Sequence, residues 1–424
     1  MSRIAPQAVS IPVGETSVNV MVPNLMAVLH AAKIPGVPDA RAEIRRAINE
    51  PIGGPRLSDI AKDKKSAAII VNDITRPYPG GLMVEELAAE LAKSGFTDAD
   101  IYLVIAYGNH RKNTEEECRR MFGNAVVDRF RIVHHDPYDP NRLVTIGTTD
   151  GGVPVQVNKE FMEADVRIAT GCITPHASAG FSGGRKSVMP GIAGIDGLKR
   201  HHSFPIRPKD PKMGWLEGNP FHEEALAVAR MAKVDFIVNA VENAERELVS
   251  AVAGDLDDAH KAGVKVCRSI WGASVPSRPD VVIVSPGGYP RDFDLHQSQK
   301  AVSCAELICK PKGRIILCAE ARDGVGKFGQ RMKDAKHPQD VVDQFHKEGF
   351  AADSSSKAYM WCRGLVSFSV GVACSSVSKE ELAQLFMKGY DTVEDAIADA
   401  LKDFGDDATF VVIPHAAEIV PSVG

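Results

Sequence analysis

Short runs of apolar and β-branched residues alternate with amphipathic segments along most of the chain, and this alternation limits the folds open to it. The short runs are typical of buried strands and span residues 67–71, 101–105, 130–133, 166–169, 281–284, 314–317, 366–370 and 410–413. Apolar residues at three- and four-residue spacings predict helices over 82–93, 114–121, 221–232, 297–308, 379–386 and 393–404. Thr114 and Glu117 have the spacing of a capping box. Such alternation builds largely parallel sheets covered on both faces by helices, so we predict an α/β fold.

The segment 268–279 divides this pattern into two parts. It contains Gly272, two prolines and several serines, a composition typical of a crossover between domains. We therefore predict two α/β domains, one over residues 1–272 and one over 273–424. Ligands of such folds bind where loops leave the carboxyl ends of strands, so we expect an active-site cleft between the domains.

Composition and charge exclude several classes of protein. With 44% hydrophobic and 25% charged residues among 424, the chain can bury an ordinary core, which excludes disorder, collagen and coiled coil. The formal net charge of -5 provides no basic field for nucleic acid or an acidic membrane. No run reaches the roughly 18 apolar residues of a membrane span, and the eight cysteines form no C-x-x-C pair. We expect a cytoplasmic protein that binds neither nucleic acid nor membrane.

Polar side chains follow the first two predicted strands. Asp73, Thr75 and Arg76 come directly after the first, and an arginine there can hold a carboxylate or phosphate with two hydrogen bonds. The alternative is a turn in which Asp73 bonds its own backbone and Arg76 makes a surface ion pair. Gly108 and His110 follow the second strand, and histidine exchanges protons most readily near neutral pH. A structural histidine is the alternative at that position.

A glycine-rich loop around a lysine follows the predicted strand 166–169. It reads Gly-Phe-Ser-Gly-Gly-Arg-Lys over residues 180–186, with His176 before it and His202 after it. Glycines gathered around a lysine favour a bound anion or cofactor. The spacing partly matches a Walker A loop, but Arg185 replaces the last glycine and the loop begins too far from its strand. We therefore do not expect a site for a nucleoside triphosphate.

Two further motifs lie in the second half of the chain. Gln297 and Lys300 are three residues apart on a predicted helix and share one face, for which a solvated polar surface is the alternative. Residues 324–329 read Gly-Val-Gly-Lys-Phe-Gly, a formal G-x-G-x-x-G after a strand. We expect no helix to open promptly behind it, and no clear ribose-binding acid follows, so the dinucleotide signal is weak.

Taken in order, these motifs resemble those of the nickel-pincer lactate racemase family. The resemblance rests on Asp73-x-Thr75-Arg76-Pro77, Gly108-x-His110-Arg111, His176 with the 180–186 loop, His202, and Gly288-Tyr289-Pro290 with Gln297-x-x-Lys300. Segments 217–220, 236–239 and 253–255 also match, so the resemblance covers residues 67–300. It implies a two-domain racemase or epimerase that inverts C2 of a 2-hydroxy acid.

The resemblance also implies a cofactor and a role for each residue. The cofactor is nickel held by pyridinium-3,5-bisthiocarboxylic acid mononucleotide, the nickel-pincer nucleotide. Lys186 matches the lysine that tethers it covalently, and His202 matches the histidine that completes nickel coordination. His110 and His176 match the catalytic acid and base. The other matched positions are substrate-binding for Arg76, Gln297 and Lys300, and cofactor-binding for Asp73, Thr75, Ser182 and Gly183. For Arg76, contact with the cofactor phosphate is the alternative.

The chemistry that the resemblance implies explains these residue types. The α-hydrogen of a 2-hydroxy carboxylate is too weakly acidic for histidine to remove as a proton. It leaves instead as hydride to the cofactor while a histidine takes the hydroxyl proton, which gives a bound 2-oxo acid. Return of hydride to the other face inverts the centre. Two histidines are needed because the hydroxyl lies on opposite sides in the two enantiomers.

Two positions leave the substrate open. His296 stands where lactate-specific members have a tyrosine beside the substrate, so lactate, malate, aromatic lactates and sugar acids are all candidates. Trp361 is either a family tryptophan near the cofactor or a core residue.

The competing functions are an NAD-dependent dehydrogenase that uses residues 324–329 and a non-catalytic nickel or cofactor carrier. Expected partners are the small hydroxy acid and the proteins that make or insert the cofactor, and the sequence leaves a homo-oligomer open.

Overall fold

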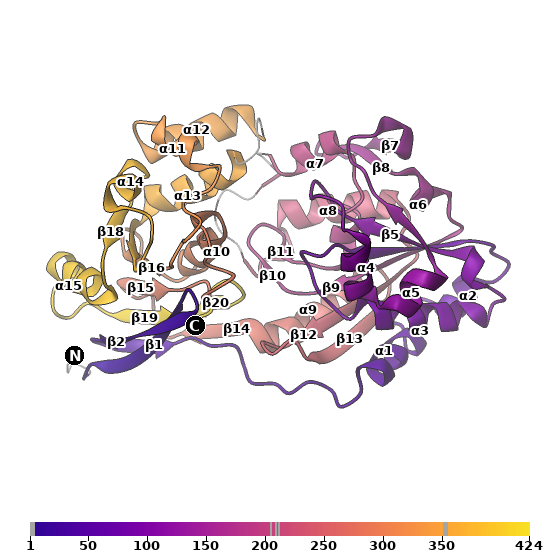
Figure 1. Cartoon of the computed structure of the whole chain (residues 1–424), viewed down its shortest axis with the longest axis horizontal. Helices are drawn as coiled ribbons and strands as arrows, with labels where there is room; N and C mark the ends of the chain where they lie inside the picture. The colour runs from indigo at the N-terminus through magenta and orange to yellow at the C-terminus, as the bar shows by residue number, and fades with distance from the viewer. Residues whose placement is uncertain (1–4, 204–205, 208–209, 211–212, 351–354) are drawn as a thin grey trace. The chain divides into compact units, whose positions relative to one another are not determined.

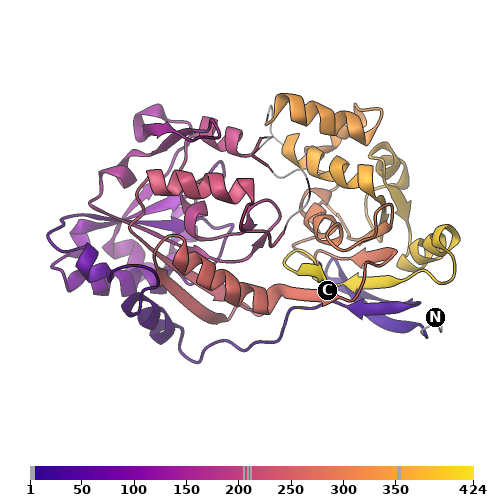
Figure 2. The same cartoon turned by 180° about the vertical axis from the view of Figure 1, so that it is seen from behind.

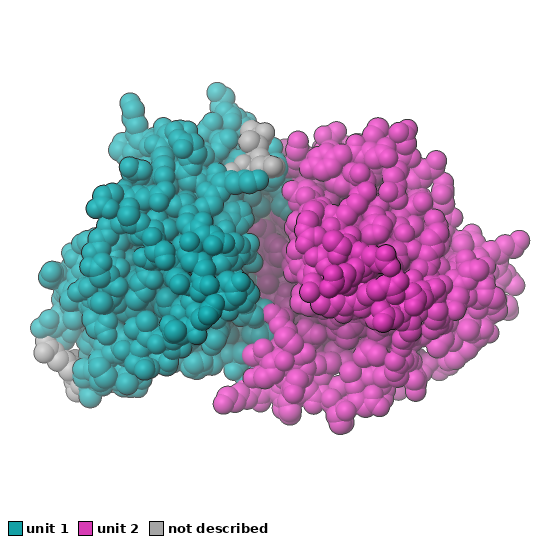
Figure 3. All heavy atoms as spheres, in the orientation of Figure 1, with its two compact units in different colours: residues 1–32, 202–214, 271–424 teal, residues 33–201, 215–270 magenta. Residues whose placement is uncertain are grey.

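The computed structural model describes residues 5–203, 206–207, 210, 213–350 and 355–424. The chain forms two compact units, which Figure 3 colours separately. Unit 1 comprises residues 1–32, 202–214 and 271–424, and unit 2 comprises residues 33–201 and 215–270. The predicted domains 1–272 and 273–424 differ from these units, because unit 1 also takes the N-terminal segment and the short segment 202–214.

Unit 2 is built on a six-stranded sheet. Its strands lie in the order β13 (Leu248–Gly254), β12 (Phe236–Glu242), β9 (Val166–Cys172), β4 (Ala67–Asn72), β5 (Ile101–Ala106) and β6 (Arg131–His134). β13 runs antiparallel to β12, and the other neighbouring strands run parallel. The first five residues of the central strand β4 are all buried, as expected for a strand covered on both faces.

Helices cover both faces of this sheet. One core joins the strands to α1 (Ala40–Asn49), α2 (Leu57–Ile60), α3 (Gly80–Ala92), α4 (Glu115–Phe122) and α5 (Asn124–Arg129). The 3-10 helix η3 (Gly184–Ser187) packs against β4, β9 and β12, with α8 (Pro220–Met231) and α9 (Asp258–Trp271) beside it. Figure 2 shows α8 and α9 on the side turned to the reader.

Smaller elements complete unit 2. Two antiparallel hairpins are formed by β7 (Leu143–Thr148) with β8 (Pro154–Asn158), and by β10 (Pro175–His176) with β11 (Gly180–Phe181). The remaining helical segments are η1 (Asp98–Asp100), η2 (Pro140–Arg142), α6 (Lys159–Glu163) and α7 (Ile195–His201). The short β10–β11 hairpin carries His176, one of the predicted site residues.

Unit 1 contains a second six-stranded sheet, in which all neighbouring strands are parallel (Figure 1). Their order is β18 (Lys388–Tyr390), β17 (Ser369–Ala373), β16 (Arg314–Cys318), β15 (Val281–Val284), β19 (Phe410–Ile413) and β3 (Leu25–Val28). The helices are α10 (Leu295–Ala305), α11 (Gly329–Lys333), α12 (Pro338–Glu348), α13 (Ser355–Ser367), α14 (Lys379–Gln384) and α15 (Val393–Phe404). β14 (Gly272–Val275) pairs in parallel with β20 (Val420–Val423).

The N-terminal segment belongs to unit 1 for a packing reason. β1 (Gln7–Val13) and β2 (Thr16–Val22) form an antiparallel hairpin whose alternate apolar residues are buried. They share a core with β15, β16, β19 and α15, and β3 then extends the sheet beside β19. Burial of these apolar strands groups the N-terminal segment with unit 1, whereas the prediction placed it in the domain 1–272.

The predicted α/β class with largely parallel sheets is confirmed. Each predicted strand region contains a strand and each predicted helical segment contains a helix, but one strand was misplaced. Val366 continues helix α13, and the strand begins at Ser369. The capping box is confirmed, because the Thr114 hydroxyl accepts from the N–H of Glu117 at 3.2 Å and the Glu117 carboxylate accepts from the N–H of Thr114 at 2.8 Å.

Most cysteines of the chain lie in its interior. All eight cysteines are free thiols and seven of them are buried. Burial raises the pKa of the Cys362 thiol to about 12, which keeps it protonated and weakly nucleophilic. No helix within the described residues combines the length and the apolar character that crossing a membrane requires.

Candidate active site

Three loops of unit 2 leave the same edge of its sheet. β4, β5 and β9 are neighbouring parallel strands, with Asn72 opposite Ala106 and Ile70 opposite Ala169. Their carboxyl ends therefore meet at one edge. The loops behind them carry the predicted site residues of this unit, which are Asp73, Thr75, Arg76, His110, His176, Ser182, Gly183 and Lys186. Ligand sites of open α/β sheets lie at such an edge.

Asp73 and His110 form a hydrogen-bonded pair at the ends of β4 and β5. The Asp73 carboxylate is buried, and its Oδ2 lies 2.7 Å from Nδ1 of His110. Its Oδ1 accepts from the Thr75 hydroxyl at 2.7 Å. An ionised carboxylate only accepts hydrogen bonds, so this partner assigns the proton of neutral His110 to Nδ1 and leaves a lone pair on Nε2. His110 itself is 45% exposed, so Nε2 can be reached by a small molecule.

His176 has the opposite surroundings. It sits in the β10–β11 hairpin, where its Nδ1 accepts hydrogen bonds from the N–H groups of Ser178 and Ala179, both at 3.1 Å. A nitrogen that accepts two N–H donors carries no proton of its own, so the proton of neutral His176 lies on Nε2. The two histidines therefore present different atoms in their neutral forms: a lone pair on Nε2 of His110 and an N–H on Nε2 of His176.

The lysine loop is held tightly against the sheet. Gly183 has φ +76°, and a Cβ there would lie 2.8 Å from Ile173 Cγ1, so the position requires glycine. The Ser182 hydroxyl donates to the Cys172 carbonyl at 2.7 Å and accepts from the N–H of Thr174 at 2.8 Å. These side-chain bonds give Ser182 a structural role in shaping the loop.

Phe221, at the start of α8, connects Lys186 and His176. Nζ of Lys186 lies 5.3 Å from the centre of the Phe221 ring, and the ring of His176 lies 6.4 Å from the same ring. Lys186 is half-buried on η3. The sequence predicted Lys186 and His176 but gave no signal for the aromatic residue that contacts both.

Arg185 is a second residue that the sequence did not single out as functional. Its side chain is fully buried, and Nη2 donates to the carbonyls of Ala179 and Phe181, both at 2.8 Å. Nη1 donates to the Gly183 carbonyl at 3.2 Å and lies 2.8 Å from Nε2 of His260. Burial lowers the pKa of Arg185 to about 9. The guanidinium thus pins the hairpin of His176 and the loop of Lys186 together.

Neutral histidines lie behind this guanidinium. Burial, with Arg185 beside it, holds the pKa of His260 well below its usual range. Burial and the same guanidinium lower the pKa of His222 to about 3, and the two imidazoles stack with their centres 6.3 Å apart. Both rings stay neutral at neutral pH.

The loops of His110 and Lys186 are also tied to each other. The N–H of Gly108 donates to the carbonyl of Gly191 at 2.9 Å, and the hydroxyl of Ser187 donates to the carbonyl of Thr170 at 3.0 Å. Asn239 Oδ1 accepts from the N–H of Gly184 at 2.9 Å. The edge of the sheet thus carries one connected framework of backbone and side-chain bonds.

Arg76 lies on the exposed end of the β4 loop.

The remaining predicted site residues lie in unit 1. His202 follows α7 directly, and its ring lies 6.4 Å from that of Phe350. Gln297 and Lys300 are on α10, where Nζ of Lys300 donates to Oε1 of Gln297 at 2.8 Å. The Asp294 carboxylate caps this helix by accepting from the N–H of Gln297 at 2.7 Å. The described residues contain no group of three or more His, Cys, Asp or Glu side chains arranged to hold a metal ion.

The G-x-G-x-x-G sequence packs against α10. Gly324 accepts from the N–H of Leu295 at 3.0 Å, and a Cβ on Gly326 would lie 3.2 Å from the Cβ of His296. The expectation that no helix follows promptly is wrong, because α11 begins at Gly329, although it spans only five residues. The glycines thus allow close packing beside His296. Trp361 is fully buried and stacks on Phe328, so it is a core residue.

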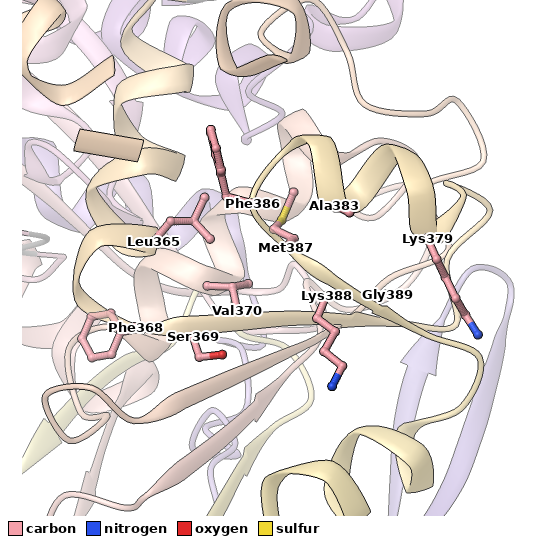
Figure 4. A pocket seen from close by; sticks show the side chains of 10 residues that line it. All are labelled: Leu365, Phe368, Ser369, Val370, Lys379, Ala383, Phe386, Met387, Lys388 and Gly389. Carbon is pink, nitrogen blue, oxygen red and sulfur yellow. The ribbon is translucent and has the colours of Figure 1, made fainter. Parts of the chain in front are cut away.

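Two cavities lie away from the predicted catalytic, substrate-binding and cofactor-binding residues. One of about 520 Å³ is bordered by β17, β18 and α14 (Figure 4), and another of about 640 Å³ lies beside α11 and α12. No predicted site residue lines either cavity.

The chain matches two family models. They are the lactate racemase N-terminal domain over residues 13–214 and the lactate racemase C-terminal domain over residues 275–420. A lactate racemase from Thermoanaerobacterium thermosaccharolyticum is 35% identical over 383 residues, which cover 89% of each chain. The chain belongs to the lactate racemase family.

Further relatives agree with this membership. A lactate racemase from Lactiplantibacillus plantarum is 33% identical over 384 residues, covering 89% of this chain and 90% of that relative. The structure of the lactate racemase apoprotein from T. thermosaccharolyticum has a TM-score of 0.91 at 32% identity and covers 98% of this chain and 100% of that one. A protein from Thermotoga maritima, at 18% identity and a TM-score of 0.65, shares the fold. As a member of the lactate racemase family, the chain is an isomerase.

Proposed function

We propose that this lactate racemase family member inverts C2 of a 2-hydroxy acid by reversible hydride transfer, with a nickel-pincer nucleotide attached to Lys186. Lactate is the substrate named for its relatives. The observation that carries the proposal is the pair of histidines behind β5 and β9, the strands on either side of β4, with Nδ1 of one bound to a carboxylate and Nδ1 of the other bound to two N–H groups.

His110 is suited to accept a proton. Asp73 holds the Nδ1 proton and thereby points the Nε2 lone pair outward. When Nε2 takes the hydroxyl proton of one enantiomer, the imidazolium remains beside a buried carboxylate, which stabilises its charge. Asp73 is therefore a positioning residue for His110.

His176 is suited to hold the substrate oxygen in its neutral form. Its Nε2–H can donate to the hydroxyl or oxo oxygen, and its backbone partners fix the ring. To act as an acid or base, His176 exchanges its Nδ1 bonds to Ser178 and Ala179 for a protonated Nδ1. This exchange has a cost that His110 does not bear, so the two residues are not interchangeable.

The predicted cofactor-binding residues fit a cofactor attached through an amine. Lys186 offers a primary amine beside the aromatic ring of Phe221, on a loop already shaped by Arg185 and Gly183. His202 offers an imidazole, a ligand type that suits nickel. When bound, the nickel-pincer nucleotide supplies a reversible hydride acceptor. The side chains of the protein bind and orient the substrate and move its hydroxyl proton.

Arg76, Gln297 and Lys300 provide the charge and the hydrogen bonds that a hydroxy carboxylate needs. Arg76 and Lys300 are exposed cations, and the Gln297 amide lies within hydrogen-bond distance of Lys300. We propose that they hold the substrate carboxylate, so that the C2 oxygen is presented to the histidines. Proteins that make or insert the cofactor are the expected partners.

The proposal is tested by loading the protein with cofactor. The protein is produced together with the cofactor-synthesis enzymes, the Lys186 peptide is analysed by mass spectrometry, and nickel is quantified in the same sample. We expect an adduct on Lys186, nickel in equal amount to the chain, and interconversion of D- and L-lactate or another 2-hydroxy acid by chiral chromatography.

Two results would reject the proposal. One is an unmodified Lys186 without nickel under conditions that load the T. thermosaccharolyticum enzyme. The other is reduction of added NAD by a hydroxy acid, which a dehydrogenase predicts. A Lys186→Arg variant keeps the positive charge but cannot form the same linkage, so it serves as the control for adduct assignment.

A further inference from the structure

One face of α10 in unit 1 carries more polar side chains than the substrate-binding pair requires. His296, Gln299, Lys300 and Ser303 repeat at three- and four-residue spacings and so share a face of the helix. Gln299 is fully buried, and its amide donates to the Ser303 hydroxyl at 2.7 Å. This face lies beside Gln297, which we assign to the substrate.

Helix α13 brings a further cation to this face. Nζ of Lys357 donates to Oε1 of Gln299 at 3.3 Å, and no carboxylate among the described residues pairs with it. Burial, together with the positive charges of Lys300 and Arg207, lowers the pKa of Lys357 to about 7. A lysine in this position is costly to the protein alone, and an anion bound beside it would remove the cost.

His296 lies near these two lysines on one side and packs against the loop of Gly326 and Phe328 on the other. Burial lowers the pKa of His296 to about 4, with contributions from Lys357 and Lys300, so its imidazole is a neutral hydrogen-bonding group at neutral pH. Phe328 lies 6.3 Å from the His296 ring, and Gly326 allows the loop to approach it closely. Asp294 is the acidic group here, and burial raises its pKa.

We propose that His296, Lys300 and Lys357 form a subsite for an anionic group on the side chain of the substrate, which makes the substrate a 2-hydroxy acid with a second carboxylate. This assignment rests on the proposed function, because Lys300 is placed there as a ligand of the first carboxylate. One carboxylate neutralises one of the two lysines, and a second carboxylate neutralises the other.

A phosphate is the other anion that this chemistry would bind. The substrate is favoured because Lys357 contacts the residue next to Lys300 and faces the same helix side as His296. The Lys186 tether, by contrast, lies in unit 2. The experiment therefore separates substrate binding from cofactor loading.

The test uses the cofactor-loaded enzyme and the variant Lys357→Met, which removes the charge and keeps the length of the side chain. Lys402→Met, an exposed lysine of α15 in the same unit, is the matched control. Racemisation of malate and of lactate is measured for each protein, together with binding of L-malate and L-lactate by calorimetry. The Lys186 adduct is quantified by mass spectrometry.

We expect the wild-type enzyme to prefer malate, and the malate-to-lactate ratio of kcat/KM to fall by about 10- to 100-fold in Lys357→Met, as loss of a charged hydrogen bond predicts. The ratio stays unchanged in Lys402→Met. Turnover of lactate without malate, or an equal loss for both acids, would overturn the subsite and leave the proposed function standing.

Two other results separate the remaining explanations. A reduced Lys186 adduct in Lys357→Met assigns the cation to the cofactor phosphate and overturns the subsite. If the loaded enzyme turns over neither malate nor lactate, the proposed function is judged on the other 2-hydroxy acids and the subsite on binding alone. In that case malate binding that weakens in Lys357→Met still supports the subsite, and equal binding of both acids overturns it.

Discussion

His110 and His176 are the same residue type behind β5 and β9, the two strands that flank β4, yet the protein holds them in different ways. His110 lies in a half-exposed loop, and its partner is the carboxylate of one side chain, Asp73. His176 lies in a short hairpin whose backbone supplies two N–H donors, and the buried guanidinium of Arg185 binds that hairpin from behind. The Asp73 carboxylate orients the ring of His110, and two backbone N–H groups orient the ring of His176.

The difference teaches that proton position can be chosen by local partners. A carboxylate next to Nδ1 favours the imidazolium, whereas two N–H groups next to Nδ1 oppose it. We infer that His110 is held ready to take up a proton, whereas His176 gives up its two Nδ1 hydrogen bonds each time it carries the second proton. The predictions below change one side of this comparison at a time, from the largest effect to the smallest.

The largest loss is expected when either imidazole is removed. His110→Ala and His176→Ala should each lower kcat for racemisation by about 10²- to 10⁴-fold, the usual range for a general acid or base. Cofactor loading on Lys186 should persist, as measured by mass spectrometry. Asn109→Ala, an exposed neighbour in the same loop, is the control. Normal turnover in both histidine variants would reject their assignment.

The next largest effect tests the carboxylate that distinguishes His110. Asp73→Asn keeps the shape of the side chain but removes its charge, so the His110 proton is no longer fixed on Nδ1 and the imidazolium loses its stabilising partner. We expect kcat to fall on the order of 10²-fold; loss of the equivalent carboxylate in serine proteases is larger still. Thr75→Val, which removes one hydrogen bond to Asp73, should cost only a few-fold. Equal losses in both variants would mean that the charge is unimportant.

A third prediction addresses the guanidinium behind His176. Arg185→Leu leaves several buried carbonyls without a donor, so we expect the free energy of unfolding to fall by about 3 kcal/mol. Urea denaturation measures this loss. Arg185→Lys keeps a positive charge but cannot make the paired bonds, so it should recover only part of the stability. Unchanged stability in Arg185→Leu would show that the hairpin does not depend on this residue.

The smallest effect concerns the pH dependence of the free energy of unfolding, to which the buried His222 contributes. The pKa of His222 is about 3 in the folded chain and about 6.5 when unfolded, so the unfolded state binds more protons below pH 6.5. The contribution of His222 to stability is complete above pH 6.5 and is lost as the pH falls toward 3.

Between pH 6.5 and pH 5 the loss from His222 amounts to about 2 kcal/mol. Denaturation at both pH values should show a smaller difference in His222→Gln than in the wild type. His30→Gln, at an exposed position, should behave like the wild type. An unchanged pH difference in His222→Gln would place the acid sensitivity elsewhere.

The sequence predicted features that depend on neighbouring residues. The strands, the helices and the loops behind β4, β5 and β9 follow from residue spacing, and the parallel sheet then collects those loops at one edge. The capping box of Thr114 and Glu117 is local in the same way. The roles of the site residues remain predictions.

What the sequence did not predict depends on contacts between distant segments. Asp73 and His110 were each selected, but nothing in their spacing indicates a bond between them. Arg185 adjoins Lys186, and no pattern distinguishes a fully buried arginine from a half-buried lysine beside it. Lys357 lies on a helix for which no periodicity was recognised. The environment of each of these residues depends on its tertiary neighbours. The spacing of residues in one sequence does not show which distant segments will be neighbours.

The N-terminal strands also bear on how the protein is made. β3 pairs with β19, and the two strands are separated by nearly the whole length of the chain. During synthesis the ribosome releases β1, β2 and β3 first, whereas β19, the sheet partner of β3, emerges near the end. The apolar β1–β2 hairpin therefore lacks part of its core through most of translation. Completion of this sheet is a late folding event with high contact order, and it exposes the nascent chain to chaperones and to aggregation in the interval.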